Sequence, residues 1–251
     1  MIESNLHKIY KTLCSLPGGN FIYNINQFIN KRKNKRKMQK QIVNFKKYSV
    51  SVLDKMITIS KAVNVDLFLF FGTHLGAYRD HSFISHDIDM DFGILSKDDF
   101  QKLIKYLKNT DCNIDHCYYS PINGISELTL EFNKIHVDVF LINKENNSEF
   151  FTNCYCTDAY VNEEIALCRT HKIFFPSFKL QTMEFLGHNC LIPSNSNDVL
   201  SSIYGDDYMI PNPNHKSGSR CKHIEYIDSW ISPVFYYKGS SLNKILEDCI
   251  N

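Results

Sequence analysis

The sequence predicts an α/β or α+β fold, in which helices flank a mixed β-sheet and a helical arm precedes it. Three observations support this prediction. An amphipathic helical repeat comes early in the chain, a short continuous apolar run follows it, and several strand-like runs come later. This order of helix, strand, helix and strands is typical of a mixed sheet. The 251 residues, 43% of them hydrophobic, are enough for one large domain or a domain with an appendage.

Three regions are expected: residues 1–44 as an N-terminal basic helical arm, 45–215 as the main domain, and 216–251 as a C-terminal extension packed on that domain. The segment Asn30 to Lys47 holds nine lysines and arginines and no acid, although the whole chain has a formal net charge of +1. It lacks interleaved aromatic residues, so a nucleic-acid partner is not expected. The segment predicts contact with anionic lipid or, equally, a solvated helix face or linker, and the sequence leaves these open.

The cysteines and the apolar runs bear on the compartment. No run of 18 apolar residues and no secretory signal pattern is present. The nine scattered cysteines are therefore expected to be reduced thiols. The protein is expected to be cytoplasmic, either entirely or with peripheral contact at the inner face of a membrane. One set, Cys154, Cys156, Cys168 and His171, has a spacing that allows zinc. Unrelated thiols are the preferred reading, so zinc is not the expected cofactor.

The first elements follow from local patterns. Between residues 45 and 63, apolar residues recur at spacings of four, four, three and four, which predicts an amphipathic helix. The run "DLFLFF" (Asp66 to Phe71) predicts a buried strand that ends at Gly72. Thr73 is an allowed N-cap for a helix over "THLGAYR". Residues 83–95 are expected to be extended.

The later elements are equally local. Ser96 and Asp99 have capping-box spacing and predict a helix over "SKDDFQKLIKYLKN". Three strand-like runs follow: "NIDHCYY", "ISELTLEF" and "KIHVDVFLI". The tail holds "KIFFPSF", "LQTMEFLGHNCLIPS", a helix over "SNDVLSSIYG" and a loop rich in proline and asparagine, "MIPNPNHKSGS".

Three aspartates at alternate positions, Asp87, Asp89 and Asp91, raise the question of function. In a strand they share one face, with Ile88, Met90 and Phe92 on the other, whereas in a helix they would be spread over about 400°. Three carboxylates on one face must be solvated, share protons or bind a cation such as Mg²⁺. For the triplet alone, an exposed polar face on an edge strand is the preferred reading.

The neighbouring residues change that balance. Gly72 and Thr73 lie between an apolar strand and a helix, where backbone N–H groups are free to hold phosphate. Arg79 follows, and arginine grips phosphate bidentately. Asp138 lies inside the apolar run "HVDVF", where a lone carboxylate is costly unless it has a partner. A metal shared with the aspartate triplet would supply that partner.

The stretch "GTHLGAYRDHSFISHDIDMDFGI" resembles the signature of the LicD/fukutin family, G-T-x-L-G-x-x-R followed by F-I, D-x-D-x-D and a glycine. The segments "HVDVF" and "IPSNSNDVLSSIYGDDYMIPNP" are similar to later segments of that family, so the resemblance covers residues 45 to 214. His86 stands where tryptophan is common, and Ile88 stands where bacterial members have a second, adjacent aspartate. The residues that carry the signature are Gly72, Thr73, Leu75, Gly76, Arg79, Phe83, Ile84, Asp87, Asp89, Asp91 and Gly93.

The resemblance implies a nucleotidyltransferase fold, a divalent metal (Mg²⁺ or Mn²⁺) and a CDP-linked donor. It implies transfer of phosphocholine or a phospho-alditol, such as glycerol or ribitol phosphate, to a sugar hydroxyl of a cell-surface glycan or its lipid-linked precursor. An enzyme that makes an activated nucleotide-linked donor, a D-x-D glycosyltransferase and a non-catalytic glycan- or nucleotide-binding scaffold remain as alternatives.

The expected roles divide into metal binding, donor binding and base catalysis. Asp89 and Asp91 are expected to bind the metal, with Asp87 as a further ligand or a supporting catalytic group. Asp138 is either a ligand or the general base. The donor phosphates are expected to be held by Gly72, Thr73 and Arg79. His74 contacts the donor or lies on the helix surface, and His136, on the face of Asp138, is a weaker candidate.

Overall fold

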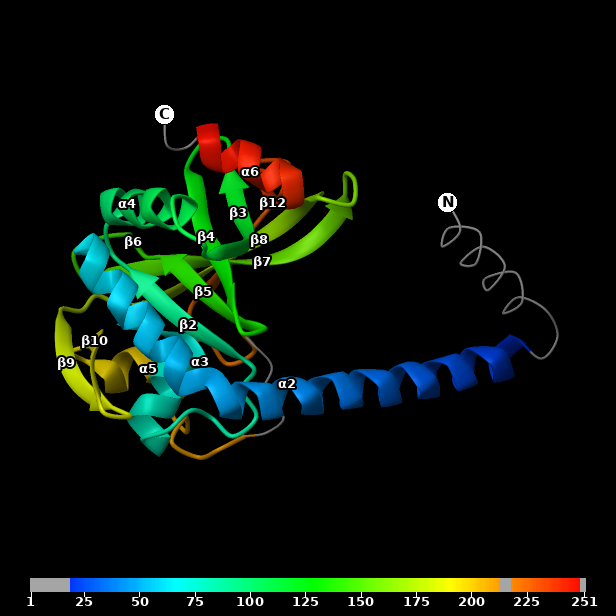
Figure 1. Ribbon diagram of the computed structural model, residues 1–251, viewed down its shortest axis with the longest axis horizontal. Helices are drawn as coiled ribbons and strands as arrows, with labels where there is room; N and C mark the ends of the chain where they lie inside the picture. The colour runs from blue at the N-terminus through cyan, green and yellow to red at the C-terminus, as the bar shows by residue number, and fades with distance from the viewer. Residues whose placement is uncertain (1–18, 213–217, 249–251) are drawn as a thin grey trace. The chain divides into compact units, whose positions relative to one another are not determined.

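The computed structural model describes residues 19–212 and 218–248, with side-chain positions from residue 31 onward. The chain divides into two compact units, Met1–Val43 and Asn44–Asn251, and the division falls within the long helix α2 (Gly19–Val63). The second unit holds the sheet and all the other described elements (Figure 1). The expected boundaries at residues 44 and 215 stay predictions.

A mixed sheet of twelve strands organises the second unit, as the sequence predicts. Eleven strands follow the order β6-β7-β8-β12-β3-β4-β5-β2-β1-β10-β9, and β11 pairs with β8 outside that path. Among the described strands, β2 pairs with β5 and β1 with β10 in parallel, and the other pairs are antiparallel. The bounds are β1 (Phe68–Leu69), β2 (Asp89–Ile94), β3 (Asn113–Ser120), β4 (Gly124–Phe132), β5 (Ile135–Leu141), β6 (Asn143–Lys144), β7 (Glu149–Tyr160), β8 (Ile165–Pro176), β9 (Leu180–Phe185), β10 (His188–Pro193), β11 (Ile224–Ile227) and β12 (Val234–Lys238).

Three helices cover one face of the sheet. They are the C-terminal half of α2, α4 (Lys97–Lys108) and α6 (Gly239–Asp248), and they share one apolar core with β2, β3, β4 and β5. Met90 and Phe92 enter this core from β2, with 0% and 2% of their surface exposed. Figure 1 shows α4 and α6 beside each other over the sheet. This core explains why the apolar residues between the aspartates point to this side.

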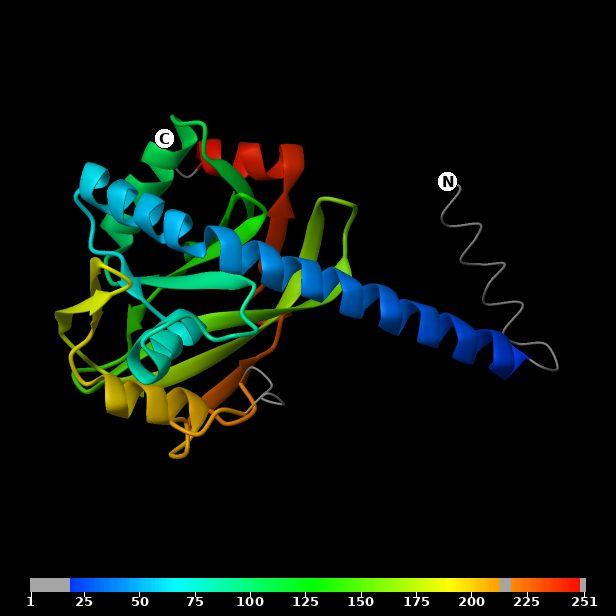
Figure 2. The same cartoon turned by 60° about the horizontal axis from the view of Figure 1, so that its bottom comes forward.

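The other side of the sheet packs against α5 (Ser196–Tyr204) and the short helix α3 (Phe71–Leu75), which continues into the π-helical turn η1 (Gly76–Asp80). A second apolar cluster joins Phe70 and Phe140 to strand β8 and to Val199 of α5. Figure 2 shows α5, in gold, on the opposite side of the sheet from α6, in red. The polar face of β2 therefore lies beside α3 and near this second cluster.

Several predicted elements are confirmed. Helix α4 begins after Ser96, whose hydroxyl accepts a hydrogen bond from the Asp99 N–H at 3.2 Å, as the capping-box spacing predicts. The helix over "SNDVLSSIYG" is α5. The three strand-like runs are β3, β4 and β5. The predicted apolar helix is the C-terminal part of α2, with Val52 and Met56 buried.

Three local predictions are wrong. The run "DLFLFF" forms only the two-residue strand β1, because the chain turns into α3 at Phe71. Thr73 is not an N-cap: Phe70 holds that position, without a side-chain cap, and Thr73 lies inside the helix. The extended stretch is shorter than residues 83–95, because β2 begins only at Asp89.

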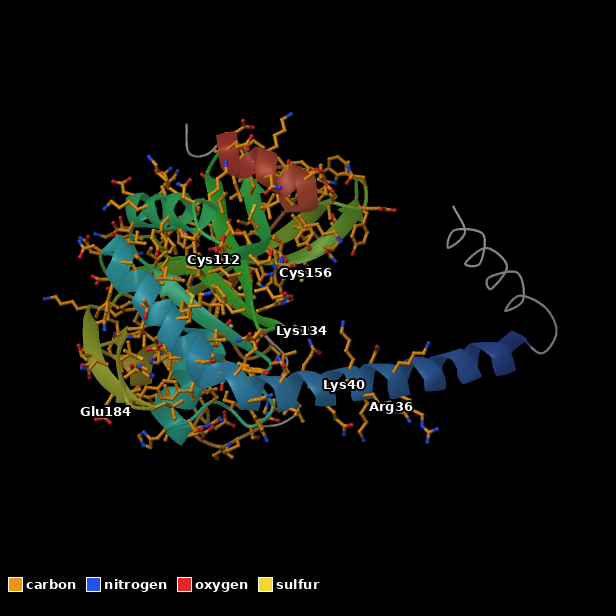
Figure 3. The ribbon with its side chains drawn as sticks, in the orientation of Figure 1. Arg36, Lys40, Cys112, Lys134, Cys156 and Glu184 are labelled. Atoms are coloured by element: carbon orange, nitrogen blue, oxygen red, sulfur yellow. The ribbon has the colours of Figure 1, made fainter. Side chains whose placement is uncertain are left out.

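The basic segment lies on α2. All ten residues from 31 to 40 are exposed. Figure 3 shows the side chains of Arg36 and Lys40 extending away from the axis of this helix. Residues 30–47 include no acidic side chain, so the positive charge of this exposed helix face favours anionic partners.

Candidate active site

Aspartates from two neighbouring strands meet on one face of the sheet. In the parallel pair β2–β5, Asp91 lies directly opposite Asp138, and Asp89 lies opposite His136. Side chains that are in register on adjacent strands point to the same face. The structure therefore brings together Asp89, Asp91 and Asp138. Asp89 and Asp138 are 49 residues apart in the sequence.

Asp87 reaches the same place by a different route. It precedes β2, in a turn where its N–H donates to the Ile84 carbonyl at 3.0 Å. A Cβ atom added to Gly72 would lie 3.2 Å from Asp91 Oδ2 and 3.8 Å from Asp87 Oδ2, so both carboxylates approach Gly72. The Oδ2 atom of Asp87 is buried and has no hydrogen-bond partner. Strand alternation does not place Asp87; the turn does.

Gly72 and Thr73 are engaged by Asp91. The Gly72 N–H donates to Asp91 Oδ2 at 3.0 Å, and the Thr73 hydroxyl accepts a hydrogen bond from the Asp91 N–H at 2.9 Å. Thr73 is 1% exposed. The two residues thus fix α3 to β2 and orient the Asp91 carboxylate. The Gly72 N–H and the Thr73 hydroxyl, which were predicted to bind the donor phosphates, are occupied by these hydrogen bonds.

His74 is an internal residue with 0% of its surface exposed. Its Nε2 lies 2.8 Å from Ser196 Oγ, and the Ser196 hydroxyl donates to the Pro193 carbonyl at 2.6 Å. Because the serine hydrogen is used there, His74 must be the donor, through Nε2–H. Burial lowers the pKa of His74 to about 3, so the ring is neutral at physiological pH. In this structure the buried His74 joins α3 to α5.

Arg79 lines a cavity of about 570 Å³ beside the aspartates. Its guanidinium donates two hydrogen bonds to Asp80, at 2.8 and 2.7 Å, and a third to the Tyr208 carbonyl at 3.2 Å. Gly72 and Asp87 line the same cavity, which we call the donor cavity. The complete wall consists of Gly72, Leu75, Arg79, Asp80, Phe83, Ile84, Ser85, His86, Asp87, Tyr204, Tyr208, Ile210, Pro211, Asn212 and Arg220.

A second arginine, Arg220, enters the donor cavity from the C-terminal part of the chain and forms an ion pair with Asp207. Arg220 could not be predicted from the sequence, because it lies 141 residues beyond Arg79 and no local pattern connects the two. The cavity also includes His86.

The carboxylates repel one another. Burial raises the pKa of Asp87 to about 7, with a further contribution from the charge of Asp89. Burial also raises the pKa of Asp138 to about 6. The hydrogen bond from Thr129 lowers this pKa, but its effect is smaller than that of burial. The pKa values of Asp89 and Asp91 are raised as well, first by burial; at Asp91 the charges of Asp89, Asp138 and Asp87 add to it.

This set fits a divalent cation. Its donors are carboxylate oxygens, which hard cations prefer, and the partnerless Oδ2 of Asp87 is available as a ligand atom. A cation would stabilise the ionised form of the aspartates, whose pKa values are raised first by burial and then by their mutual repulsion. The residues present therefore match the metal that the sequence led us to expect.

Glu127 is a further carboxylate that was not predicted from the sequence. It lies on β4, which pairs with β5, and burial raises its pKa well above the ordinary value, with additional effects from Asp138 and Asp91. The signal was present in "ISELTLEF", where Glu127, Thr129 and Glu131 alternate with apolar residues. The polar face of the sheet thus extends from β2 across β5 to β4.

A chain of hydrogen bonds leads from Asp138 toward β3. The Thr129 hydroxyl donates to Asp138 Oδ1 at 2.5 Å, and the same oxygen lies 3.0 Å from His116 Nε2. Because threonine has one hydroxyl hydrogen, His116 must donate through Nε2–H. The other ring nitrogen lies 2.8 Å from Asp115 Oδ2. This chain fixes the orientation of the Asp138 carboxylate.

Another group of metal-ligating side chains gathers among the described residues. Asp115, Glu131 and His136 offer ligand atoms that all lie within 4.8 Å of one another. His136 and Glu131 are in register across β5 and β4, so this group continues the polar face beyond Asp89. His136 Nε2 lies 3.8 Å from Glu131 Oε2 and 4.0 Å from Asp115 Oδ2, so the histidine ring lies between two carboxylates.

The cysteine and histidine set does not converge. Cys154 and His171 are opposite each other in the β7–β8 pair, but Cys168 lies three residues from His171 on β8 and so points to the other face. None of the seven cysteines within the described part of the chain forms a disulfide. Cys14 and Cys249 lie outside the described residues.

Comparison with known proteins identifies the family. Residues 64–195, just over half of the chain, match the family described as LicD/FKTN/FKRP, nucleotidyltransferase domain. The chain belongs to this family. The matched region includes α3, β2 and β5, which carry the aspartates. Membership in the LicD/FKTN/FKRP family points to a phosphotransferase, as the signature in the sequence led us to expect.

One similar relative is the mouse protein described as ribitol-5-phosphate transferase FKTN. It is 24% identical to the LicD-family chain over 168 residues, which cover 66% of this chain and 34% of the mouse protein. The chain thus spans about a third of the length of this curated relative. Within residues 19–212 and 218–248, no helix combines the length and the apolar character needed to cross a membrane.

Proposed function

We propose that this LicD-family chain is a metal-dependent transferase. It moves a phospho-alditol or phosphocholine group from a CDP-linked donor to a sugar hydroxyl of a cell-surface glycan or its lipid-linked precursor. The observation that carries this proposal is the register of Asp91 with Asp138 on parallel strands, beside a cavity that contains Arg79 and Arg220. Family membership and the similarity to a ribitol-5-phosphate transferase support it.

Donor binding is assigned to the donor cavity. Arg79 and Arg220 would turn from Asp80 and Asp207 toward the phosphates, since guanidinium groups bind phosphate and carboxylate with the same geometry. Gly72 lacks a Cβ atom that would occupy the space between Asp87 and Asp91. In this proposal Gly72 and Thr73 act indirectly, by holding Asp91, and His74 acts through Ser196 by holding α3 on α5.

The metal is assigned to Asp89 and Asp91, with Asp87 as a further ligand. When bound, Mg²⁺ or Mn²⁺ would neutralise the charge of the donor pyrophosphate. Asp138 is assigned as the general base. Its raised pKa, about 6, makes it a stronger base than an ordinary carboxylate while it is still ionised at neutral pH.

The proposed reaction balances without any further reactant. Asp138 takes the proton of the acceptor hydroxyl, the hydroxyl oxygen bonds to the donor's β-phosphorus, and the bond from that phosphorus to the oxygen of CMP breaks. CMP leaves with that electron pair. Thr129 donates its hydrogen bond to Asp138 throughout, and thereby keeps the carboxylate oriented.

Release of CMP tests the proposal. The purified chain is incubated with CDP-glycerol, CDP-ribitol or CDP-choline, an oligosaccharide acceptor and Mg²⁺ or Mn²⁺. We expect metal-dependent CMP release and phosphorylated product, and a loss of at least about 100-fold in Asp89→Ala and Asp91→Asn. Asp98→Asn, an exposed aspartate on α4, is the matched control. Undiminished transfer by Asp89→Ala would contradict the proposal.

A second candidate function follows from the family description, which names a nucleotidyltransferase domain. Such an enzyme would make the activated donor from CTP and an alcohol phosphate, and would release pyrophosphate. The two functions are separated by their products, since CMP release supports transfer from a CDP donor and pyrophosphate release from CTP supports donor synthesis. Metal-dependent binding of both nucleotides without turnover would instead favour a scaffold.

We also propose that the exposed basic segment of α2 contacts an anionic membrane surface at the cytoplasmic face, where a lipid-linked acceptor would lie. Its nine lysines and arginines would contribute about 1 kcal/mol each near such a surface. Sedimentation with vesicles that contain phosphatidylserine tests this. Binding should weaken as the salt concentration rises, because salt screens the charges. Equal binding to neutral vesicles would refute it.

A further inference from the structure

A second cavity, of about 400 Å³, lies where β5 ends and β7 and β8 pass it. Asn143 follows β5, Asn153 and Tyr155 come from β7, and Thr170 and Lys172 come from β8. We call it the lysine cavity, because Lys97 and Lys172 are its charged wall residues. It shares no wall residue with the donor cavity. Its wall consists of Lys97, Ser120, Asn123, Ser126, Leu141, Asn143, Phe151, Asn153, Tyr155, Thr170, Lys172, Ile227, Ser232 and Val234.

The wall combines positive charge with many neutral hydrogen-bonding groups. Three asparagine amides and the hydroxyls of serine, threonine and tyrosine side chains line it, and no carboxylate is among its described wall residues. Such groups pair with the hydroxyls of a polyol, since amides and hydroxyls both donate and accept hydrogen bonds. Two lysines without an acid beside them in the wall favour an anionic ligand.

Thr170 supplies an independent observation. The residue is 4% exposed, and its hydroxyl oxygen is buried without a hydrogen-bond partner. Buried polar groups are normally hydrogen-bonded, and an unsatisfied one is costly. Because Thr170 lines the lysine cavity, a ligand hydroxyl or phosphate oxygen in the cavity would satisfy it.

The two lysines are poorly neutralised by the protein itself. Lys97 is the first residue of α4, where the helix dipole disfavours a cation, and it joins none of the ion pairs found among the described residues. The Lys172 ammonium lies over the ring of Phe151, 4.3 Å from its centre, and its nearest carboxylate oxygen, in Glu145, is 4.0 Å away. Both ammonium groups are therefore available to an anion.

We propose that the lysine cavity binds a phosphorylated sugar or alditol, with its phosphate at Lys97 and Lys172 and its hydroxyls at the asparagines and Thr170. As an acceptor subsite this inference rests on the proposed transferase function. Leu141, in the cavity wall, is three residues from Asp138 along β5, or roughly 10 Å, and the two side chains point to opposite faces of the strand. The ligand is therefore an anionic unit within a longer acceptor, and the attacked hydroxyl lies on another unit.

Tyr155 links the cavity to the carboxylate face. Its hydroxyl lies 2.5 Å from Ser126 Oγ, and its ring stacks on Tyr118 with ring centres 4.4 Å apart. Ser126 immediately precedes Glu127 on β4. An acceptor that occupies the lysine cavity would thus lie against the strand that carries Glu127 and Thr129.

Calorimetry on the full chain, with EDTA and without nucleotide, tests the binding step. The probes are galactose 6-phosphate, glycerol 3-phosphate, galactose, glycerol and inorganic phosphate. We expect the two phosphorylated polyols to bind at least tenfold more tightly than either the neutral polyols or inorganic phosphate. Equal affinity for phosphate alone, or for the neutral polyols, would overturn the proposal.

Variants locate the site. Lys172→Gln should weaken galactose 6-phosphate binding about tenfold and Thr170→Val about fivefold, since one charge-assisted and one neutral hydrogen bond are lost. Lys105→Gln, an exposed lysine on the same helix as Lys97, is the matched control and should bind as the wild type does. Circular dichroism confirms that each variant is folded, and Lys97→Gln provides a second test away from β8.

A failure of this inference is distinguishable from a failure of the proposed function. Metal-dependent binding of CDP-glycerol is measured on the same variants, and Arg79→Lys is included. If Arg79→Lys, but not Lys172→Gln, weakens galactose 6-phosphate binding, the sugar phosphate occupies the donor cavity and the inference is wrong. If CDP-glycerol fails to bind while galactose 6-phosphate binding depends on Lys172, the binding site stands and the transferase proposal falls.

Discussion

At the scale of single residues, the hydroxyl of Thr129 modulates the basicity of Asp138. Its hydroxyl donates to the ionised carboxylate, which lowers the pKa of Asp138 against the larger effect of burial. Thr129→Val removes this hydrogen bond, so the pKa of Asp138 should rise further. The acid limb of the pH profile of kcat/KM should shift to higher pH, and Thr129→Ser should restore it. An unchanged acid limb in Thr129→Val would show that Asp138 is not the titrating base.

The raised pKa values also predict how stability depends on pH. Asp87 and Asp138, with pKa values of about 7 and about 6, hold protons more tightly in the folded chain than in the unfolded chain, where the value is about 3.9. The metal-free protein should therefore lose stability as pH rises from about 5 to about 7, by up to about 1.4 kcal/mol per pH unit for each proton.

Urea denaturation in EDTA checks this dependence. Asp87→Asn and Asp138→Asn should each flatten the decline in the free energy of unfolding, and Asp98→Asn, on the surface of α4, should not. A metal ion should reverse the trend, since it binds the ionised carboxylates. Identical slopes in wild type and both site variants would contradict the assignment.

Residues close in sequence were predictable, and residues brought together by the sheet were only partly so. The period-two pattern placed Asp89 and Asp91 on one face, and the cost of burying Asp138 pointed to a partner for it. The pairing of β4 with β5, which adds Glu127, depends on register, which no local pattern contains. Arg220 and the engagement of Gly72 and Thr73 by Asp91 depend on tertiary packing in the same way.

At the scale of secondary-structure elements, Gly93 allows β1 and β2 to approach each other closely. It is the register partner of Phe68, and a Cβ atom at position 93 would lie 2.2 Å from Phe68 Cζ. Gly93→Ala should therefore lower the free energy of unfolding by about 1–3 kcal/mol, because the core has no room for the methyl group. Chemical denaturation measures the loss.

A double-mutant cycle identifies the cause of that loss. In a Phe68→Leu background the ring is absent, so the added methyl group should cost less than it does in the wild type. An equal cost in both backgrounds would mean that strain elsewhere in β2 is responsible.

Elements were predicted best where their ends carry their own signals. Ser96 and Asp99 predicted the start of α4, and the amphipathic repeat predicted the packed part of α2. The turn into α3 at Phe71 has no side-chain cap, and Phe71 has a positive φ of 36°, so the sequence signalled the wrong start there. The long hairpin of β7 and β8 was missed, because its central residues alternate only weakly and many are polar.

The division of the chain at residue 43 predicts an outcome for the whole molecule. The first fully buried side chain described on α2 is Phe45, and residues 31 to 40 are all exposed. A chain of residues 44–251 should therefore fold cooperatively, with a melting temperature within about 5 °C of that of the full chain, and should keep its metal-dependent stabilisation. It should lose most of its binding to anionic vesicles.

Differential scanning fluorimetry and vesicle sedimentation on both chains measure these effects. A matched full-length variant, in which Lys31, Lys33, Lys35 and Lys37 become glutamine, separates charge from length. If residues 44–251 unfold at a much lower temperature while this variant does not, the first 43 residues contribute to folding. Unchanged vesicle binding by the variant would exclude the basic segment as the contact.

The two hydrogen bonds between Asp91 and the start of α3 order the Asp91 carboxylate before any ligand binds. Gly72 donates to the Asp91 carboxylate, and the Asp91 amide donates to Thr73, so the two segments are fastened reciprocally. The carboxylate geometry is thus preorganised during folding, before any ligand arrives, and binding need not include the entropic cost of ordering these groups. The amide hydrogens of Gly72 and Asp91 should consequently exchange slowly with deuterium in the ligand-free chain, and they offer a spectroscopic record of whether the centre is intact.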